Sequence, residues 1–307
     1  MLINCSYQNI SPPTVWSGDF FFNLSSVLKI EYTMNYGELV QRIKSISGVS
    51  DFFTVGYSLL SQPIYAAHVG SYSGRQVIVQ CAIHAREWVT ALLGVELTKY
   101  LATRQFGGGA YFIYNMDPDG IRLVLDGADF VECEKQKRFL LDVNGSEDFS
   151  QYKANANAVD LNVNFDADWG SGAQNRRCPS PESFIGYYPM SEREVNVLAT
   201  FTRKIAPYAT LSYHTKGEVI YYGFAGQNEN SLARDEAVAY KLSAVTGYIP
   251  ILTRGSAGGY KDWCVREFDI PAFTIEVAPS DADHPIGEEY LPELFDQNKN
   301  VVSALLS

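Results

Sequence analysis

The sequence predicts a single α/β domain in which a mixed, mostly parallel, twisted sheet of about eight strands is flanked by helices. Three observations predict it. Short apolar runs alternate with longer stretches of helical periodicity along most of the chain. A length of 307 residues with 46% hydrophobic content is enough for one large core. The chain carries no internal repeat and no linker-like segment. We therefore expect one domain over residues 35–307, preceded by an N-terminal arm, residues 1–34.

The first half of the domain is predicted to hold two helices and four strands. We expect helices over residues 36–46 and 87–104, and strands over residues 53–57, 64–68, 76–83 and 110–115. In the second helix the apolar residues fall on one stripe. The Gly-Ser-Tyr-Ser-Gly segment at residues 70–74 predicts that the strands on either side of it pair as a hairpin.

The second half opens with long loops and then returns to alternating strands and helices. Residues 121–190 are rich in Gly, Asn, Asp and Pro, which is typical of functional loops. A capping box at residues 191–194 predicts a helix to about residue 205. Further helices are expected after residue 230, ending at Gly247, and from residue 292 onward. We expect strands over residues 209–214, 218–224, 248–252 and 272–277.

A histidine and a carboxylate three residues apart follow the apolar run at residues 76–83. These residues are His84 and Glu87, and their spacing lets both side chains reach one metal ion from a single turn. A catalytic zinc usually takes three protein ligands and leaves one position for water. Of the four histidines, His214 also lies at the end of an apolar stretch, which makes it the leading third ligand. This pattern predicts a zinc hydrolase with one Zn²⁺ per chain.

A second carboxylate lies in an apolar strand further along. Glu276 stands near the end of the run at residues 271–277. Because an ionised carboxylate is costly to bury, such a residue is either paired with a cation or functional. The residues alone leave both alternatives open.

These fragments occur in the order found in the M14 zinc carboxypeptidases, which the chain resembles from about residue 35 to its end. The shared motifs are His-Ala-Arg-Glu-Trp at 84–88, Asn-x-Asp-Pro-Asp-Gly at 115–120, Asp-Leu-Asn-x-Asn-Phe at 160–165, Ser-Tyr-His at 212–214 and Thr-Ile-Glu at 274–276. The resemblance implies that His84, Glu87 and His214 bind zinc. It also implies that Glu276 is the general base and acid.

Two departures from the family pattern concern charge. Where the family has an arginine that polarises the scissile carbonyl, this chain has Lys153, which supplies the charge without the two-pronged fork. Where carboxypeptidases hold the arginine that grips the terminal carboxylate of the substrate, this chain has Val163, which cannot bind an anion. An enzyme without this clamp either uses another cation or does not require a free C-terminus.

The segments at residues 213–222 and 258–263 look most like the γ-D-glutamyl-diamino acid peptidases within the family. That group hydrolyses the γ-D-glutamyl bond to meso-diaminopimelate or lysine in cell-wall stem peptides, which carry carboxylates beside the scissile bond. The candidate substrate-binding residues are Asn162, Arg254, Arg86 and Tyr260, with Arg176 and Arg177 as weaker candidates. His284 lies in a polar turn, and we interpret it as a surface residue.

The preferred function is therefore zinc-dependent hydrolysis of a γ-D-glutamyl–diamino acid bond. The alternatives are a conventional carboxypeptidase, a small-molecule deacylase, or a catalytically silent, metal-stabilised binding module. A net charge of −11 argues against nucleic acid as a partner and leaves a peptide or muropeptide substrate. The chain shows no signal peptide and no membrane span, so a cytoplasmic location is expected. The oligomeric state stays open.

Overall fold

The structure is a computed structural model that describes residues 34–307. The predicted N-terminal arm, residues 1–34, lies outside the described residues except for Met34. The strands are β1 (Asp51–Tyr57), β2 (Pro63–Gly70), β3 (Gln76–Cys81), β4 (Gly109–Ile113), β5 (Ala209–Thr215), β6 (Val219–Tyr222), β7 (Ile249–Leu252) and β8 (Ala272–Val277). The α-helices are α1 (Tyr36–Lys44), α2 (Val89–Ala102), α3 (Pro118–Asp126), α4 (Glu134–Asn144), α5 (Arg193–Ile205), α6 (Glu229–Thr246), α7 (Tyr260–Phe268), α8 (Leu291–Asn298) and α9 (Val301–Leu306).

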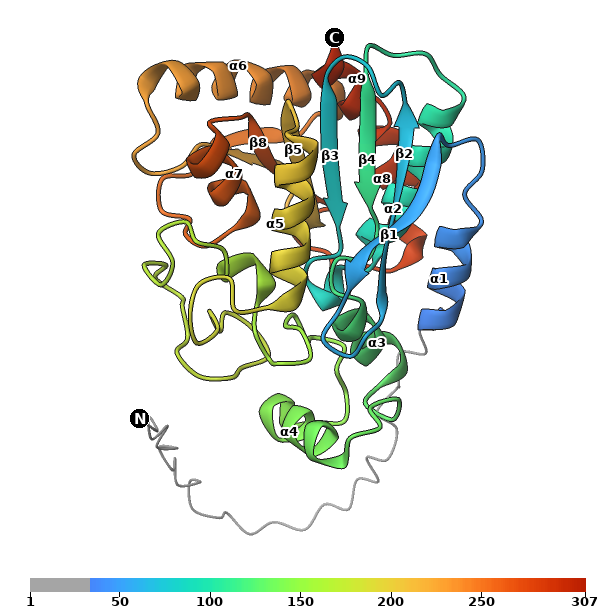
Figure 1. The fold of residues 1–307 in the computed structure, drawn as a ribbon, viewed down its shortest axis with the longest axis vertical. Coiled ribbons are helices and arrows are strands. Elements are labelled where there is room, and N and C mark those ends of the chain that lie inside the picture. Colours follow the sequence, from blue (N-terminus) through green and yellow to red (C-terminus); the bar gives the residue numbers. More distant parts are fainter. Residues whose placement is uncertain (1–33) are drawn as a thin grey trace, which may run out of the picture. The chain divides into compact units, whose positions relative to one another are not determined.

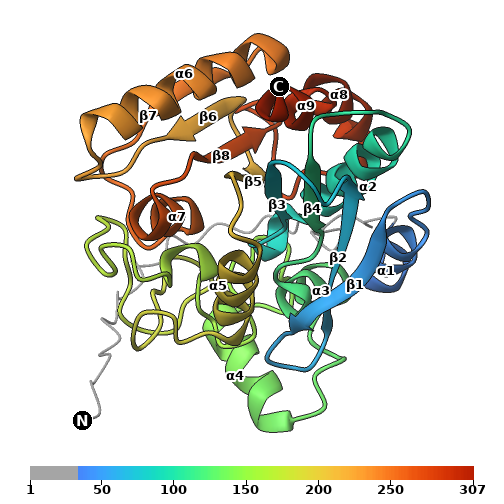
Figure 2. The same cartoon turned by 45° about the horizontal axis from the view of Figure 1, so that its top comes forward.

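All eight strands form one sheet with the order β1-β2-β4-β3-β5-β8-β6-β7 (Figure 2). The four central strands β4, β3, β5 and β8 run parallel to one another. Strands β1 and β2 add antiparallel pairings at one side, and β6 is antiparallel to β8 while parallel to β7. The prediction of a single α/β domain with a mixed, mostly parallel sheet of eight strands is confirmed.

Helices cover both faces of this sheet (Figures 1 and 2). Helices α5 and α7 lie over one face, where α5 packs on β1 and α7 packs on β5 and β8. Helices α2, α6, α8 and α9 lie over the other face. Every residue of β5 is buried because the strand is covered on both faces. The central parallel strands are therefore rigid supports for whatever follows their carboxyl ends.

The predicted hairpin between β2 and β3 is wrong. Strand β4 lies between them, so that Phe112 pairs with Ala67 on one side and with Val79 on the other. The Gly-Ser turn reverses the chain as expected, but a local turn signal does not reveal a third strand that inserts later in the sequence. Insertion of β4 gives each of its neighbours a second hydrogen-bonded partner.

Three helices, α3, α4 and α7, were not predicted from the sequence. Helix α3 has an N-terminal signal that could have been used, because Asp117 accepts from the N–H of Gly120 (3.0 Å) and Pro118 opens the helix. Helix α4 lies within the predicted loop region, and α7 follows the glycines at residues 258 and 259. The C-terminal segment forms two helices, α8 and α9, where one was expected.

The predicted capping box before α5 is also wrong. The N-cap residue of α5 is Glu192 and its side chain does not cap the helix. Ser191 Oγ instead donates to Glu192 Oε1 (2.6 Å), and Glu192 Oε2 accepts from the buried amide of Asn155 (2.8 Å). Tertiary hydrogen bonds take both side chains away from the helix terminus. Within residues 34–307, every helix is too short or too polar to cross a membrane.

Candidate active site

The candidate site lies where three neighbouring parallel strands, β3, β5 and β8, reach the same edge of the sheet. His84 follows β3 by three residues, and His214 is the penultimate residue of β5. Glu276 is the penultimate residue of β8 and is directly paired with His214 in the strand register. Parallel strands bring their carboxyl ends to one edge, which is where open α/β sheets bind ligands. Residues far apart in the sequence therefore meet here.

A tight turn after β3 orients the first two side chains. Ala82 has a left-handed φ of 52°, which turns the chain out of the strand. The N–H of Ala82 donates to Thr90 Oγ1 (2.8 Å), and that hydroxyl donates to the carbonyl of Glu87 (2.8 Å). The single 3-10 turn Ala85–Glu87 then brings the side chains of His84 and Glu87 to the same point.

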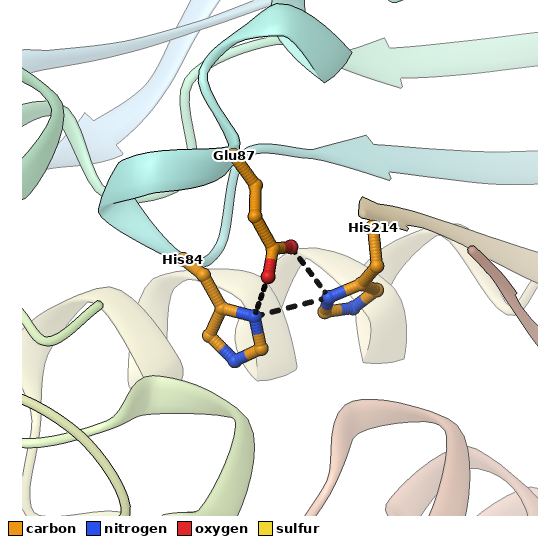
Figure 3. A group of neighbouring side chains, drawn as sticks. All are labelled: His84, Glu87 and His214. Carbon is orange, nitrogen blue, oxygen red and sulfur yellow. Dashed lines mark hydrogen bonds and ion pairs between the residues drawn. The ribbon is translucent and has the colours of Figure 1, made fainter. Parts of the chain in front are cut away.

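His84, Glu87 and His214 converge on one point, as Figure 3 shows. Glu87 Oε1 lies 2.9 Å from His84 Nδ1, and Glu87 Oε2 lies 2.9 Å from His214 Nδ1. The two Nδ1 atoms are 3.1 Å apart. All three side chains are buried, and their potential ligand atoms lie within 4.8 Å of one another. The structure thus brings the three predicted ligands together.

The surroundings of the three residues fit a zinc ion. Two imidazoles and one carboxylate are a usual ligand set for a catalytic zinc. His84 Nε2 lies 3.2 Å from Asp160 Oδ1, the kind of outer carboxylate that fixes the ring of a metal ligand. Although burial works against its charge, Lys153 and His84 lower the pKa of Asp160 below its usual range. Asp160 therefore stays an anion that can accept a hydrogen bond from His84 Nε2–H, which would leave Nδ1 able to bind a metal.

Glu276 stands beside this group with its carboxylate in a different environment. Within residues 34–307, no hydrogen bond or ion pair is formed by its side chain. Burial raises its pKa, His214 acts in the opposite direction and the nearby carboxylate of Glu87 adds to the increase, so that the pKa is about 7. A carboxyl group with a pKa near neutrality can both take up and release a proton. The salt-bridge alternative left open by the sequence is not realised among these residues.

A pocket of about 530 Å³ opens beside Glu276. Its wall includes Lys153, Asn162, Val163, Thr274 and Glu276. Lys153 Nζ lies 3.7 Å from Asp160 Oδ2. The carboxylates of Asp160 and Glu87 raise the pKa of Lys153 despite its burial, so the side chain remains a cation. Val163 stands where carboxypeptidases have the arginine that grips the terminal carboxylate. It lines this pocket.

A second cation in the pocket wall was missed by the sequence analysis. Lys261 is buried, and its Nζ donates to Asp262 Oδ1 (2.5 Å) and to the carbonyl of Gly223 (2.6 Å). Both Lys261 and Asp262 line the pocket. The sequence contains a signal for this pair, because adjacent opposite charges come shortly after two glycines. Since α7 was not predicted, these two residues were not assigned to the site.

The remaining predicted substrate residues are divided. Tyr260 has a fully buried side chain whose hydroxyl contacts Thr202 Oγ1 (2.7 Å), so its ring does not line the pocket. Only the backbone N–H of Tyr260 is near the pocket, where it donates to Asn162 Oδ1 (3.0 Å). Arg254 is exposed and does not itself line the pocket, although both its neighbours in sequence do.

Three further arginines are held by loops. Arg86 Nη1 donates to the carbonyl of Gln151 (3.2 Å). Arg176 Nη1 donates to Ser180 Oγ (2.8 Å), and Arg177 Nη2 donates to the carbonyl of Gly170 (2.8 Å). Arg176 and Arg177 thus serve to anchor the loops on which they lie.

His284 is not the surface residue that its polar turn suggested. It is half-buried, and its Nδ1 lies 3.5 Å from Thr215 Oγ1, next to His214 in the sequence. Burial and the charge of Arg86 lower its pKa to about 4, so the ring is neutral near pH 7. The turn at residues 281–285 folds back over the carboxyl end of β5, which no local pattern indicates.

Comparison with known proteins shows the family of this chain. The zinc carboxypeptidase family, by its sequence model, matches residues 37–299. The chain belongs to the zinc carboxypeptidase family. It is 32% identical over 273 residues to γ-D-glutamyl-L-diamino acid endopeptidase 1 of Lysinibacillus sphaericus, covering 83% of this chain and 68% of that protein. This zinc carboxypeptidase homologue is a zinc-dependent peptide hydrolase by family membership.

Solved structures agree with the zinc carboxypeptidase fold. Bovine thrombin-activatable fibrinolysis inhibitor, solved with a tick carboxypeptidase inhibitor, superposes with a TM-score of 0.70 at 18% identity, covering 90% of this chain and 96% of that one. Murein-tripeptide amidase MpaA of Escherichia coli O157 superposes with a TM-score of 0.56 at 19% identity, covering 87% and 94%. At these identities the likeness concerns the fold alone.

Proposed function

We propose that this zinc carboxypeptidase homologue hydrolyses the γ-D-glutamyl–diamino acid bond of peptidoglycan stem peptides. One zinc ion per chain would be held by His84, Glu87 and His214. The observation that carries the proposal is the pairing of His214 with Glu276 at the carboxyl ends of adjacent strands, beside a pocket that contains two lysines. The relative from Lysinibacillus sphaericus, whose name states this bond, supports the choice of substrate.

The three side chains would hold the ion, with Asp160 as an outer partner of His84. His84 is oriented by Asp160, and Glu87 neutralises part of the positive charge. A zinc ion held there would act as a Lewis acid and would lower the pKa of water from about 15.7 to about 7. The burial of all three side chains keeps bulk water from competing for the same positions.

Glu276 is the group that would handle the proton. Its raised pKa, about 7, lets it accept a proton from the attacking water and pass it to the leaving amine. Glu276 is paired with His214 and also lines the pocket. We therefore expect its carboxylate to reach both the attacking water and the leaving amine. The same residue therefore serves first as base and then as acid.

Lys153 would stabilise the negative charge that develops on the scissile carbonyl oxygen. It is a cation in the pocket wall, and Asp160 holds its ammonium group in place. Loss of one such donor typically costs about 3–4 kcal/mol of transition-state stabilisation. A lysine provides a point charge here, so the carbonyl is held by one contact where an arginine would offer two.

The pocket favours a polar leaving group over an aromatic one. Lys261 and Asp262 lie in the pocket wall as a buried pair, and Asn162 adds an amide. A diamino acid carries an ammonium group on its side chain, and diaminopimelate carries a carboxylate there as well. The pocket thus matches a zwitterionic side chain, which we propose for the leaving residue.

Two alternatives make different demands on these residues. A conventional carboxypeptidase needs a cation for the terminal carboxylate, and Val163 occupies the place of that cation in the pocket wall. A silent binding module needs no proton carrier, yet Glu276 is kept without a structural partner among residues 34–307. Both features favour the peptidase with a specialised substrate.

A paired assay tests the proposal. The zinc-loaded chain is incubated with L-Ala-γ-D-Glu-meso-diaminopimelate, and separately with peptides that end in aromatic or basic residues. We expect release of diaminopimelate and little release from the ordinary peptides. The reverse result would make the chain a conventional carboxypeptidase, and no release from either together with near-stoichiometric zinc would favour the binding module.

A further inference from the structure

A second polar cluster adjoins the zinc ligands and none of its side chains lines the 530 Å³ pocket. It consists of Arg86, Lys216 and His284. Arg86 precedes the ligand Glu87, and Lys216 follows His214 by two residues. His284 comes from the turn after β8 and approaches Thr215 (3.5 Å). The cluster therefore lies beside the candidate metal ligands and outside the wall of the pocket.

Hydrogen bonds join the members of the cluster into one unit. Arg86 Nη1 donates to the carbonyl of Gln151 (3.2 Å), and Gln151 Nε2 donates to the carbonyl of His284 (2.5 Å). Lys216 Nζ donates to the carbonyl of Ala282 in the same turn. These contacts use backbone carbonyls, so the positive charges of Arg86 and Lys216 are positioned without being neutralised by them.

Few carboxylates of the protein compete for this cluster. The carboxylate of Glu182 lies 3.8 Å from Arg86 Nη1, and its side chain is 45% exposed. Asp281 and Asp283, in the same turn as His284, are exposed to solvent. Arg86 Nε is buried and has no hydrogen-bond partner within residues 34–307. A buried donor without a partner is costly, and an acceptor placed beside the guanidinium would relieve that cost.

We propose that Arg86, Lys216 and His284 bind the free α-carboxylate of the γ-linked D-glutamate, on the acyl side of the scissile bond. This inference rests on the proposed function. In a γ-glutamyl bond the α-carboxylate remains free and lies close to the scissile carbonyl, whereas an ordinary peptide bond has none at that place. Two cations and a neutral imidazole N–H donor form the charge-assisted contacts that a carboxylate requires. The cluster would thus select glutamate and reject its α-carboxamide.

The test compares two substrates that differ only in this group. They are L-Ala-γ-D-Glu-meso-diaminopimelate and the same tripeptide with the α-carboxylate converted to a carboxamide. For the zinc-loaded wild type we expect kcat/KM to be about tenfold or more higher for the carboxylate, which is the scale of a charged hydrogen bond. In Arg86→Gln and His284→Ala this ratio should fall towards one, with most of the change in KM.

Controls separate specificity from damage to the metal site. Zinc content and Tm are measured for every variant, because Arg86 adjoins a ligand in the sequence. His284→Ala is the more remote substitution and must change the ratio with zinc content intact. Lys241→Met removes a cation from the exposed face of α6 and should leave both rates unchanged.

Each outcome is decisive for one of the two proposals. If the wild type cleaves both tripeptides at the same rate, the inference about the cluster is wrong and the proposed function stands. If the variants keep zinc and lose both activities equally, the cluster does not recognise the carboxylate. If neither tripeptide is cleaved, the proposed function and this inference are both wrong.

Discussion

Two groups of buried carboxylates lie in this domain, and their surroundings differ. In the active-site region, Glu87 contacts two imidazoles and Asp160 contacts an imidazole and Lys153. Although burial opposes ionisation, these neighbours lower the pKa of Glu87 and of Asp160. The region opens onto the pocket through Asp160 and Glu276. The carboxylates of the active-site region are therefore paired with basic groups and lie next to an open pocket.

The second group, called here the acidic cluster, consists of Asp117, Asp119, Glu192 and Glu194. Its contacts are mostly neutral donors: Ser58 Oγ and the N–H of Leu60 reach Asp119 (2.7 and 2.8 Å), and the N–H of Leu59 reaches Glu194 (2.8 Å). Burial raises the pKa of Asp117 and Asp119 above their usual range, and that of Glu194 to about 7.

The contrast teaches that a buried carboxylate does not by itself mark a functional site. Apart from Asp117 Oδ2, the carboxylates of the acidic cluster are contacted by N–H, hydroxyl and amide donors of the chain, so we expect the cluster to act in stability. The active-site region has basic partners and an open wall, so its charge is available to a ligand. Substitutions in the two regions should therefore separate activity from stability.

The largest effect is expected from Glu276→Gln. It keeps the shape of the side chain and removes its ability to carry a proton, so kcat should fall by about 10²–10⁴-fold. Zinc content and Tm should stay close to those of the wild type. Steady-state kinetics on the muropeptide measure the change, with Glu267→Gln on the exposed side of α7 as the matched control. A near-normal rate in Glu276→Gln would remove the proposed base.

Asn155→Ala, beside the acidic cluster, should lower stability and leave activity unchanged. The buried amide of Asn155 donates to Glu192 (2.8 Å) and accepts from the N–H groups of Asn157 and Val159 (3.0 and 3.1 Å). Losing these contacts should lower the free energy of unfolding by about 2–4 kcal/mol. Urea unfolding measures the loss, and kcat/KM of the folded fraction should be unchanged. Asn300→Ala at an exposed position is the control.

A smaller effect is expected from Asp160→Asn, which alters the outer partner of a ligand. His84 would keep a hydrogen bond but lose the ionised acceptor that orients its ring. Zinc affinity should fall by about 10–100-fold. Competition with a chromophoric chelator measures it. Unchanged affinity would mean that Asp160 serves the fold and not the metal site, and the distinction between the two regions would be weaker.

The smallest effect is a pH dependence of stability that comes from Glu194. Its pKa is raised in the folded state, so the folded protein binds more protons than the unfolded chain above pH 4.5. Stability from this group is therefore complete below about pH 4.5 and is lost as the pH rises to about 7. The slope is at most about 1.4 kcal/mol per pH unit. Urea unfolding of Glu194→Gln at several pH values should show a shallower slope than the wild type, and parallel curves would contradict this.

The sequence alone went far because its signals are local. Alternating apolar runs predicted the strands, and the spacing of His84 and Glu87 predicted that their side chains meet on one turn. His214 and Glu276 became candidates because each lies near the end of an apolar strand, and the family resemblance supplied the role of Glu276. Such positions are informative since a polar group in a buried strand needs a reason to be there.

Tertiary structure decided what local patterns do not contain. The insertion of β4 between β2 and β3 depends on pairing between distant segments, so the hairpin prediction was wrong. Tyr260 was placed in the site by its motif, but packing against Trp263 and Phe165 buries its ring in the core. His284 was assigned to the surface by its polar neighbours, and the fold of its turn brings it to Thr215.

What the sequence determined by itself was the class of chemistry, because ligand types and their spacing along one turn are properties of the chain. Only the folded structure decided which side chains contact each of these groups. The charges around Lys261, the partners of Glu192 and the closeness of His284 to Arg86 depend on side chains that meet across long separations in sequence. Electrostatic free energies vary with those distances and with burial, and neither is encoded in any single segment.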